Sequence, residues 1–308
     1  MNFMDFFWFQ SIWLGFNQEI CTMNTLRFSI TIAAFALLYG CGESSQQAEA
    51  SSNQADDGIQ EPASLGYSVV NSYPHDTASF TQGFEILNGK MLESTGLHKQ
   101  STLRLVDIKT GNVKQKIKNQ DDVFAEGLTV FNDTIYQLSW QNHVVFLYNA
   151  KDLKLIGTLP WSGEGWGITH DSTQLIISEG SEKLYFVDPS TLKLRKVLSV
   201  SDNLGAVNNL NELEMIDGFI YANRWQYDYI LKIDPSTGHV IGRLNFQDFL
   251  ARNSKKDLSY LKKEGSTAVE SGAVLNGIAY DPKEKKLYIT GKLWPEVFEI
   301  RINWDVRR

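Results

Sequence analysis

The sequence is poor in cysteine and has no excess of positive charge. Cys21 and Cys41 are the only cysteines among 308 residues, which excludes a framework of several disulfides. The formal net charge of −7 argues against nucleic-acid binding, which needs a basic face. The five histidines lack metal-ligand spacing, and no P-loop or GxSxG motif occurs. We therefore expect no bound metal, no cofactor and no nucleic-acid partner.

The N-terminal part of the chain has the features of an export signal. Arg27 supplies positive charge, and residues 28–38 form an apolar run that is too short to span a bilayer comfortably. The run ends in the tetrapeptide LYGC at residues 38–41, which resembles a bacterial lipobox. Residues 23–40 are therefore predicted to be a lipoprotein signal peptide, with Cys41 as the lipidated residue. An ordinary signal peptide cleaved nearby is the alternative.

Residues 1–22 do not fit such a signal, because they contain no Lys or Arg and include two acidic residues. We interpret them as an upstream extension that is not part of the native chain. Residues 41–66 are rich in Ser, Gln, Ala and acidic side chains, which predicts a disordered tether. The mature protein is therefore expected to be an exported monomer, anchored to a bacterial membrane through Cys41 and facing the periplasm.

Residues 67–303 contain five copies of one pattern. Each copy begins with a short apolar strand, a turn rich in Asn, Asp or Gly and an alternating strand. A third strand then leads into a second turn, and a fourth strand returns. Alternation at period two with frequent turn residues is typical of antiparallel sheet. Repeats of roughly 40 residues with four strands each are typical of propeller blades. The first strands begin near five equivalent residues, at spacings of 44, 40, 45 and 65: Gln82, Glu126, Trp166, Asn211 and Asn276.

The last interval is long because residues 245–274 form an insertion, which is charged, in places compatible with helix, and expected on the surface. The fifth copy ends at Ile302 without a fourth strand, whereas residues 67–73 alternate like a strand that has no copy of its own. The sequence therefore predicts an all-β, five-bladed β-propeller, closed by an N-terminal strand that completes the last blade. Closure removes exposed sheet edges. An open sandwich is the alternative.

The five equivalent residues predict where a functional site lies. In a propeller the first strand of each blade lines the central channel, so these residues converge at one mouth of it. A repeat that only builds a core would place one apolar residue there, but this set holds one acid, three amides and an indole. Trp140, Trp225, Lys292 and Trp294 follow about fourteen residues later in their copies. Together the two sets predict a small-ligand pocket with aromatic walls.

Glu126 is the only carboxylate among the five. Burial among tryptophans would raise its pKa towards the range useful for proton transfer, which makes it the candidate acid/base. A purely structural role for Glu126, and a core role for the tryptophans, are the alternatives. Glu164, Glu212 and Glu214 are further candidates, but strand alternation puts Glu212 and Glu214 on the face opposite Asn211.

Nine short motifs follow one another along almost the whole chain after the tether. They are Phe80–Gly83, Glu93–Gly96, Phe124–Thr129, Tyr136–Trp140, Gly163–Gly167, Leu210–Glu214, Tyr221–Trp225, Leu275–Ala279 and Thr290–Pro295. In this order they resemble the glutamine cyclotransferases, the plant and bacterial type of glutaminyl-peptide cyclotransferase. Two positions depart from the family pattern, since Ser139 stands where Thr is common and Arg224 where an apolar residue is usual.

The resemblance implies a five-bladed propeller enzyme, an aminoacyltransferase that converts N-terminal glutaminyl residues of peptides and proteins to pyroglutamate and releases ammonia. It implies Glu126 as the acid/base. It also implies a set of substrate-binding residues: Phe80, Gln82, Trp140, Trp166, Asn211, Trp225 and Lys292.

This reaction suits the predicted pocket, because the substrate brings its own nucleophile, the α-amine, and its own electrophile, the γ-carboxamide. Glu126 would take the amine proton and deliver it to the departing ammonia. Two alternatives stay open. One is a non-catalytic surface propeller that binds peptide termini. The other is a metal-dependent, lactonase-like propeller with Glu126, Asn211 and Asn276 as oxygen ligands, although indoles are poor neighbours for a hard cation.

Overall fold

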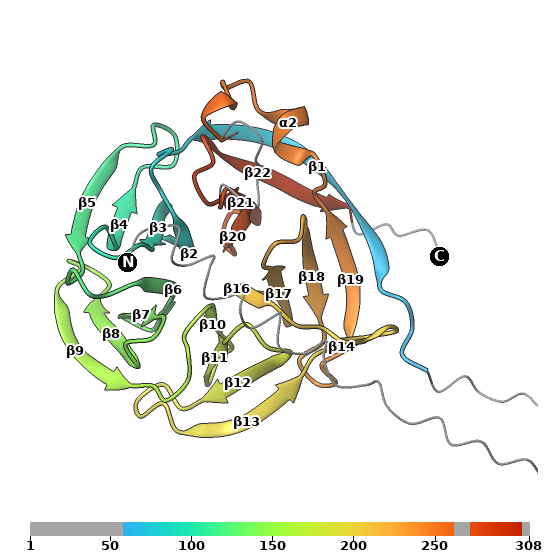
Figure 1. The fold of residues 1–308 in the computed structure, drawn as a ribbon, viewed down its shortest axis with the longest axis horizontal. Coiled ribbons are helices and arrows are strands. Elements are labelled where there is room, and N and C mark those ends of the chain that lie inside the picture. Colours follow the sequence, from blue (N-terminus) through green and yellow to red (C-terminus); the bar gives the residue numbers. More distant parts are fainter. Residues whose placement is uncertain (1–57, 262–271, 304–308) are drawn as a thin grey trace, which may run out of the picture. The chain divides into compact units, whose positions relative to one another are not determined.

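The computed structural model describes residues 58–261 and 272–303, and strands make up nearly all of the regular secondary structure in this part of the chain (Figure 1). The predicted upstream extension, signal peptide and lipidated Cys41 lie outside the described residues. No helix among the described residues is long and apolar enough to cross a membrane.

Three four-stranded antiparallel sheets follow one another along the first half of the described chain. The first sheet is β2 (Thr81–Leu87), β3 (Lys90–Thr95), β4 (Thr102–Val106) and β5 (Val113–Lys118). The second is β6 (Ala125–Phe131), β7 (Thr134–Ser139), β8 (Val144–Asn149) and β9 (Leu155–Pro160). The third is β10 (Ile168–His170), β11 (Leu175–Ser178), β12 (Lys183–Val187) and β13 (Leu194–Ser199).

The remaining long strands form one eight-stranded sheet in the order β16-β17-β18-β19-β1-β22-β21-β20. One half consists of β16 (Leu210–Ile216), β17 (Phe219–Arg224), β18 (Tyr229–Ile233) and β19 (Val240–Asn245). The other half consists of β20 (Leu275–Asp281), β21 (Lys286–Gly291), β22 (Glu296–Asn303) and β1 (Ala63–Pro74). A small hairpin precedes the first half, β14 (Ser201–Asp202) with β15 (Gly205–Ala206). The insertion contains α2 (Phe249–Asn253) and a short 3-10 helix (Ser259–Leu261).

The turns form where the sequence predicts them. Asn132 and Asp217 have φ angles of 56° and 49°, a left-handed conformation that Asn and Asp adopt more readily than most residues. Asp188 accepts hydrogen bonds from the backbone N–H groups of Ser190 and Thr191, which closes the turn between β12 and β13.

The N-terminal strand joins the two ends of the described chain. β1 pairs antiparallel with β22 from Gly66 to Pro74, so it adds the fourth strand that the last copy lacks, as predicted. Its first residues, Ala63 to Leu65, pair in parallel with β19, and Leu65 is buried in the core. The predicted tether of residues 41–66 is therefore too long at its C-terminal end. Hydrogen bonds to β19 and the burial of Leu65 draw this segment into the sheet.

The sheets stand around a common centre, and the first strand of each set is the innermost (Figure 1). These innermost strands contact one another in a closed circuit, β2–β6–β10–β16–β20 and back to β2. The strands approach so closely that a Cβ on Gly127 would lie 2.7 Å from the carbonyl oxygen of Trp166. The apolar core is divided accordingly into clusters that lie between neighbouring sheets. The fold is all-β and propeller-like.

Candidate active site

Four of the five equivalent residues occupy the same place in the structure. Gln82, Glu126, Asn211 and Asn276 are each the second residue of an innermost strand, β2, β6, β16 or β20. At each of them the register with the next strand shifts, which marks a β-bulge. A bulge bends the strand and redirects a side chain. Trp166 lies just before β10, the shortest of the innermost strands.

Glu126 is a buried carboxylate, with 5% of its surface exposed. Burial raises its pKa well above the ordinary value for glutamate, the charge of Lys292 opposes this rise, and the charge of Glu164 adds to it. No described residue gives the Glu126 carboxylate a hydrogen bond that would lower its pKa. Lys292 is also buried, and burial lowers its pKa to about 8, against the effect of Glu126. Glu126 and Lys292 therefore act on each other in one buried environment.

A chain of aromatic rings starts at Lys292 and runs from the first sheet to the second. The Lys292 Nζ atom lies 4.6 Å from the centre of the Phe80 ring, a cation–π contact. Phe80 packs edge-to-face on Phe124 at 6.2 Å, and Phe124 packs in the same way on Trp140 at 5.9 Å. Phe124 connects two predicted residues but was not itself predicted, although it opens the motif Phe124–Thr129.

A second aromatic pair comes from the third and fourth units. Trp166 packs edge-to-face on Trp225, with ring centres 5.7 Å apart. Trp166 and Trp140 are connected through Glu164, whose Oε2 accepts a hydrogen bond from both indole N–H groups, at 3.0 and 2.8 Å. The structure thus relates the predicted tryptophans to one another and adds Glu164 as the group between them.

Three amide oxygens at the equivalent positions are buried and have no hydrogen-bond partner among the described residues: Gln82 Oε1, Asn211 Oδ1 and Asn276 Oδ1. The amide nitrogen of Asn276 donates to the carbonyl oxygen of Thr81 at 2.9 Å, which ties β20 to β2. A buried acceptor without a partner is costly, and such groups occur where a ligand or water supplies the donor. The site can therefore accept several N–H groups beside one carboxylate.

Comparison with known proteins identifies the family. Residues 36–302 match the glutamine cyclotransferase family. The chain belongs to the glutamine cyclotransferase family. It is 36% identical over 236 residues to a glutaminyl-peptide cyclotransferase of Arabidopsis thaliana, a match that covers 76% of this chain and 70% of that protein. The crystal structure of Myxococcus xanthus glutaminyl cyclase superposes with a TM-score of 0.69 at 33% identity, over 79% of this chain and 99% of the other.

Trp294, expected beside Lys292 in the pocket wall of this family member, instead belongs to the core. Its ring stacks on Phe249 of α2 with an interplanar angle of 15°, and it packs edge-to-face on Phe298. Only 4% of its surface is exposed. Its indole N–H donates to the carbonyl oxygen of Ala273 at 3.4 Å, so the ring contacts both ends of the insertion.

The insertion holds the turn that carries Lys292. The Lys292 N–H donates to the carbonyl oxygen of Val274 at 2.9 Å, at the end of the insertion. The hydroxyl of Tyr260 donates to the carbonyl oxygen of Leu293 at 2.8 Å, and the Leu293 N–H donates to the Ser79 carbonyl oxygen at 2.6 Å. The sequence places this insertion on the surface but gives no sign of these contacts.

Glu212 and Glu214 connect strands and do not join the group around Glu126. Glu212 accepts from the backbone N–H groups of Phe84 and Ile278, at 3.3 and 2.9 Å, and so ties β16 to β2 and β20. Glu214 accepts from the N–H of Tyr280 at 2.8 Å. Burial raises the pKa of both carboxyls well above the ordinary value.

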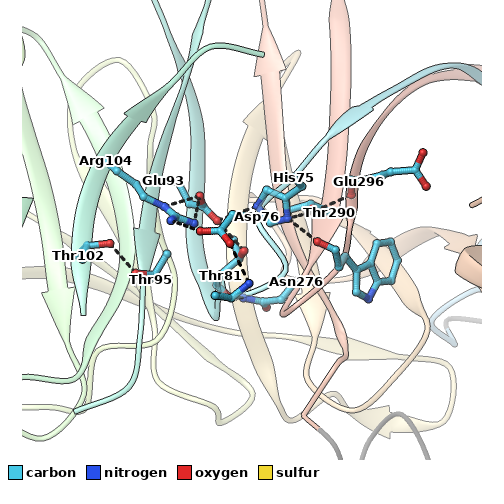
Figure 2. A network of polar contacts seen from close by, with 12 residues as sticks. His75, Asp76, Thr81, Glu93, Thr95, Thr102, Arg104, Asn276, Thr290 and Glu296 are labelled. Atoms are coloured by element: carbon cyan, nitrogen blue, oxygen red, sulfur yellow. Dashed lines mark hydrogen bonds and ion pairs between the residues drawn. The ribbon is translucent and has the colours of Figure 1, made fainter. Parts of the chain in front are cut away.

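A second set of ionisable residues, all buried except Asp76, lies where the first and last units meet (Figure 2). Glu93 on β3 accepts from Arg104 on β4 at 2.9 Å, from the Thr81 hydroxyl at 2.7 Å, and pairs with His75 at 3.0 Å. Arg104 also pairs with Asp76 at 2.8 Å. We call these four charged residues, His75, Asp76, Glu93 and Arg104, the clasp network, because β1 leads directly into it. Glu93 opens one of the nine sequence motifs, but no role was predicted for it or for the other three.

Proposed function

We propose that this protein converts N-terminal glutaminyl residues of peptides and proteins to pyroglutamate and releases ammonia. The observation that carries the proposal is Glu126, a buried carboxylate with a raised pKa at the start of an innermost strand. Its charge interacts with that of Lys292, which in turn lies on the Phe80 ring. Membership of the family and the likeness to two proteins named for this activity support it.

We also propose that the fold is a five-bladed β-propeller. The closed circuit of innermost strands, the three strands that follow each of them in sheet order, and the place of β1 beside β22 support this arrangement. In such a ring the starts of the innermost strands face one mouth of the central channel, so residues from several blades can act on one substrate.

The reaction would be an intramolecular attack of the α-amine on the side-chain carbonyl carbon. Ionised Glu126 takes a proton from the attacking amine as the new C–N bond forms. It then delivers this proton to the amide nitrogen, and the C–N bond to that nitrogen breaks to release ammonia. The proton is returned within one turnover, and no water is consumed. A carboxyl with a raised pKa suits both steps, because it binds the proton more readily than an ordinary carboxylate.

The neighbours of Glu126 have matching roles in the proposal. The protonated Lys292 would stabilise negative charge on the carboxamide oxygen as the tetrahedral intermediate forms. The amides of Gln82 and Asn211 would orient the substrate, with their buried oxygens accepting from its N–H groups. The rings of Phe80, Trp140, Trp166 and Trp225 would hold the glutaminyl methylenes and exclude water.

An ammonia-release assay with glutaminyl peptides tests the proposal. A peptide that begins with Gln should yield ammonia and a product 17 mass units lighter, as expected for loss of NH3. The same peptide with an acetylated α-amine should yield none, because its nucleophile is blocked. Binding of the free peptide without ammonia release would instead support a non-catalytic peptide-binding protein and contradict the proposal.

Export and lipid attachment remain predictions from the sequence. Mass spectrometry of the N-terminal peptide of the protein isolated from bacterial membranes would test them, with diacylglyceryl-modified Cys41 as the expected result.

A further inference from the structure

Glu164 accepts hydrogen bonds from several of the tryptophan side chains in this region. Its Oε2 accepts from the indole N–H of Trp140 at 2.8 Å and from that of Trp166 at 3.0 Å. Its other oxygen accepts from the side-chain amide of Gln141 at 3.1 Å. Its backbone carbonyl oxygen accepts from the indole of Trp161 at 3.0 Å. One residue thus receives the ring N–H groups of three tryptophans.

An indole has a single hydrogen-bond donor and no acceptor, so a bond to its N–H fixes how the ring can turn. Bonds from N–H groups to a carboxylate are roughly twice as strong as bonds between neutral groups. Trp140 follows β7 and Trp166 precedes β10, so the Glu164 carboxylate holds rings from two neighbouring sheets in a fixed relation.

The two indoles that donate to the Glu164 carboxylate also pack on further aromatic rings of the site. Trp166 packs edge-to-face on Trp225, which follows β17, and Trp140 packs edge-to-face on Phe124. Turning either indole would therefore break a ring contact as well as a hydrogen bond. The shape of the aromatic wall over three sheets depends on the two bonds to Glu164.

We propose that Glu164 is a positioning residue, whose carboxylate fixes the indoles of Trp140 and Trp166 in the orientation in which they bind the substrate beside Glu126. This inference rests on the proposed cyclisation for its kinetic consequence, but the hydrogen bonds to the two indoles can be tested without any turnover.

Glu164 also acts on Glu126 through its charge. The charged groups that act on Glu126 from the elements around it are Lys292, which favours the ionised form, and Glu164, which disfavours it. Removing the negative charge of Glu164 should therefore lower the pKa of Glu126. The acidic limb of kcat/KM, which reports the ionisation of Glu126 in the free enzyme, should then move to lower pH.

Three variants separate these effects. Glu164→Ala removes both the acceptor and the charge, whereas Glu164→Gln removes the charge but keeps an oxygen that can accept both indole N–H groups. Glu179→Gln is the matched control, because Glu179 is a half-buried carboxylate that accepts from the hydroxyls of Ser181 and Tyr185 and not from an indole. The readouts are peptide-cyclisation kinetics across pH and the indole N–H resonances of the ¹⁵N-labelled full chain.

In Glu164→Ala we expect kcat/KM to fall by about 10- to 100-fold, mainly through a higher KM, because two charge-assisted bonds are lost. The indole resonances of Trp140 and Trp166, assigned with Trp→Phe variants, should both shift. In Glu164→Gln the KM should stay within about threefold of the wild type, as expected when a neutral acceptor replaces a charged one, and the acidic limb should move to lower pH. Glu179→Gln should change neither the KM nor the two resonances.

Unshifted Trp140 and Trp166 resonances in Glu164→Ala would overturn the inference, and so would a wild-type KM in that variant. If Glu164→Ala does not fold, unshifted Trp140 and Trp166 resonances in Glu164→Gln, where a neutral acceptor replaces the carboxylate, would overturn it. If the wild type releases no ammonia, the proposed function fails, while the resonances of the two indoles still decide whether Glu164 fixes them.

Discussion

Two glutamates in neighbouring sheets are buried to almost the same degree, but their pKa values are shifted in opposite directions. Glu93 and Glu126 are 1% and 5% exposed. Burial alone would raise the pKa of both carboxyls. Around Glu93 the charges of Arg104 and His75 and the Thr81 hydroxyl reverse this effect and lower the pKa to about 2. Around Glu126 burial dominates, and the pKa is raised well above the ordinary value.

The difference shows how one fold uses a buried carboxylate in two ways. A carboxylate that is fully paired is locked in its ionised form, so it can tie strands together but cannot exchange a proton near neutral pH. A carboxylate that is buried without such partners costs stability, yet it can take up and return a proton. The clasp network is accordingly a structural device, and Glu126 is the group suited to chemistry. Five predictions test this contrast.

The largest expected effect is on turnover. Replacing Glu126 by Gln removes the proton acceptor while keeping the size of the side chain, so kcat should fall by about 100- to 10,000-fold. Ammonia release from a Gln-initiated peptide measures it, and far-ultraviolet circular dichroism checks that the variant is folded. Near-wild-type turnover in a folded Glu126→Gln protein would remove Glu126 from the mechanism.

The next largest effect is on stability. Glu93→Gln leaves the Arg104 guanidinium, which is 4% exposed, without its main counter-charge. Breaking one partner of a buried ion pair costs about 3–5 kcal/mol, so the free energy of unfolding at pH 7 should fall by that amount in urea titrations. A control variant, Asp107→Asn, removes an exposed carboxylate of the same sheet and should change stability by less than about 1 kcal/mol.

The difference in the free energy of unfolding between wild type and Glu93→Gln should become smaller as the pH falls. The pKa of Glu93 is lowered from 4.5 to about 2 in the folded state. Its ionised form therefore stabilises the fold fully above pH 4.5, and this contribution is lost as the pH falls towards 2. The free energies of unfolding of wild type and Glu93→Gln should therefore approach each other as the pH falls through this range. A difference of constant size would show that the ion pairs of Glu93 are not its source.

The strands and the equivalent positions could be predicted because their signals are local. Alternation, Asn and Asp turns and repeated spacing predict that Gln82, Glu126, Asn211 and Asn276 begin equivalent strands, and the structure places each at a bulge. The bulges themselves were not predicted, because an extra residue in one strand is visible only against its partner strand.

The clasp network and the contacts of the insertion could not be predicted, because their partners meet only in the closed fold. Glu93 and Arg104 face each other across β3 and β4, but His75 reaches them only because β1 pairs with β22 and then leads into the first sheet. The packing of Trp294 could not be predicted for the same reason. Its place in the sequence puts it beside Lys292, but in the structure its ring packs in the core against Phe249 and Phe298.

A smaller effect is expected from Lys292→Arg. The pKa of Lys292 is lowered to about 8, so this side chain is charged below pH 8 and loses its proton above it. Arginine stays charged throughout. The ratio of kcat/KM for the variant to that for the wild type should therefore rise above pH 8, and taking the ratio cancels the titration of the substrate amine. A ratio that stays flat with pH would show that the charge of Lys292 is not used.

The smallest effect concerns the insertion. Tyr260→Phe removes the hydrogen bond to the Leu293 carbonyl oxygen and leaves the ring in place. One such bond contributes about 0.5–1.5 kcal/mol, so looser placement of Lys292 should lower kcat by about two- to tenfold. Tyr227→Phe is a matched control, because Tyr227 is 40% exposed against 45% for Tyr260 and packs on Tyr229, away from this turn. If both substitutions change kcat equally, the insertion does not hold the turn for catalysis. The contrast between paired and unpaired buried charges would then account for the site without the insertion.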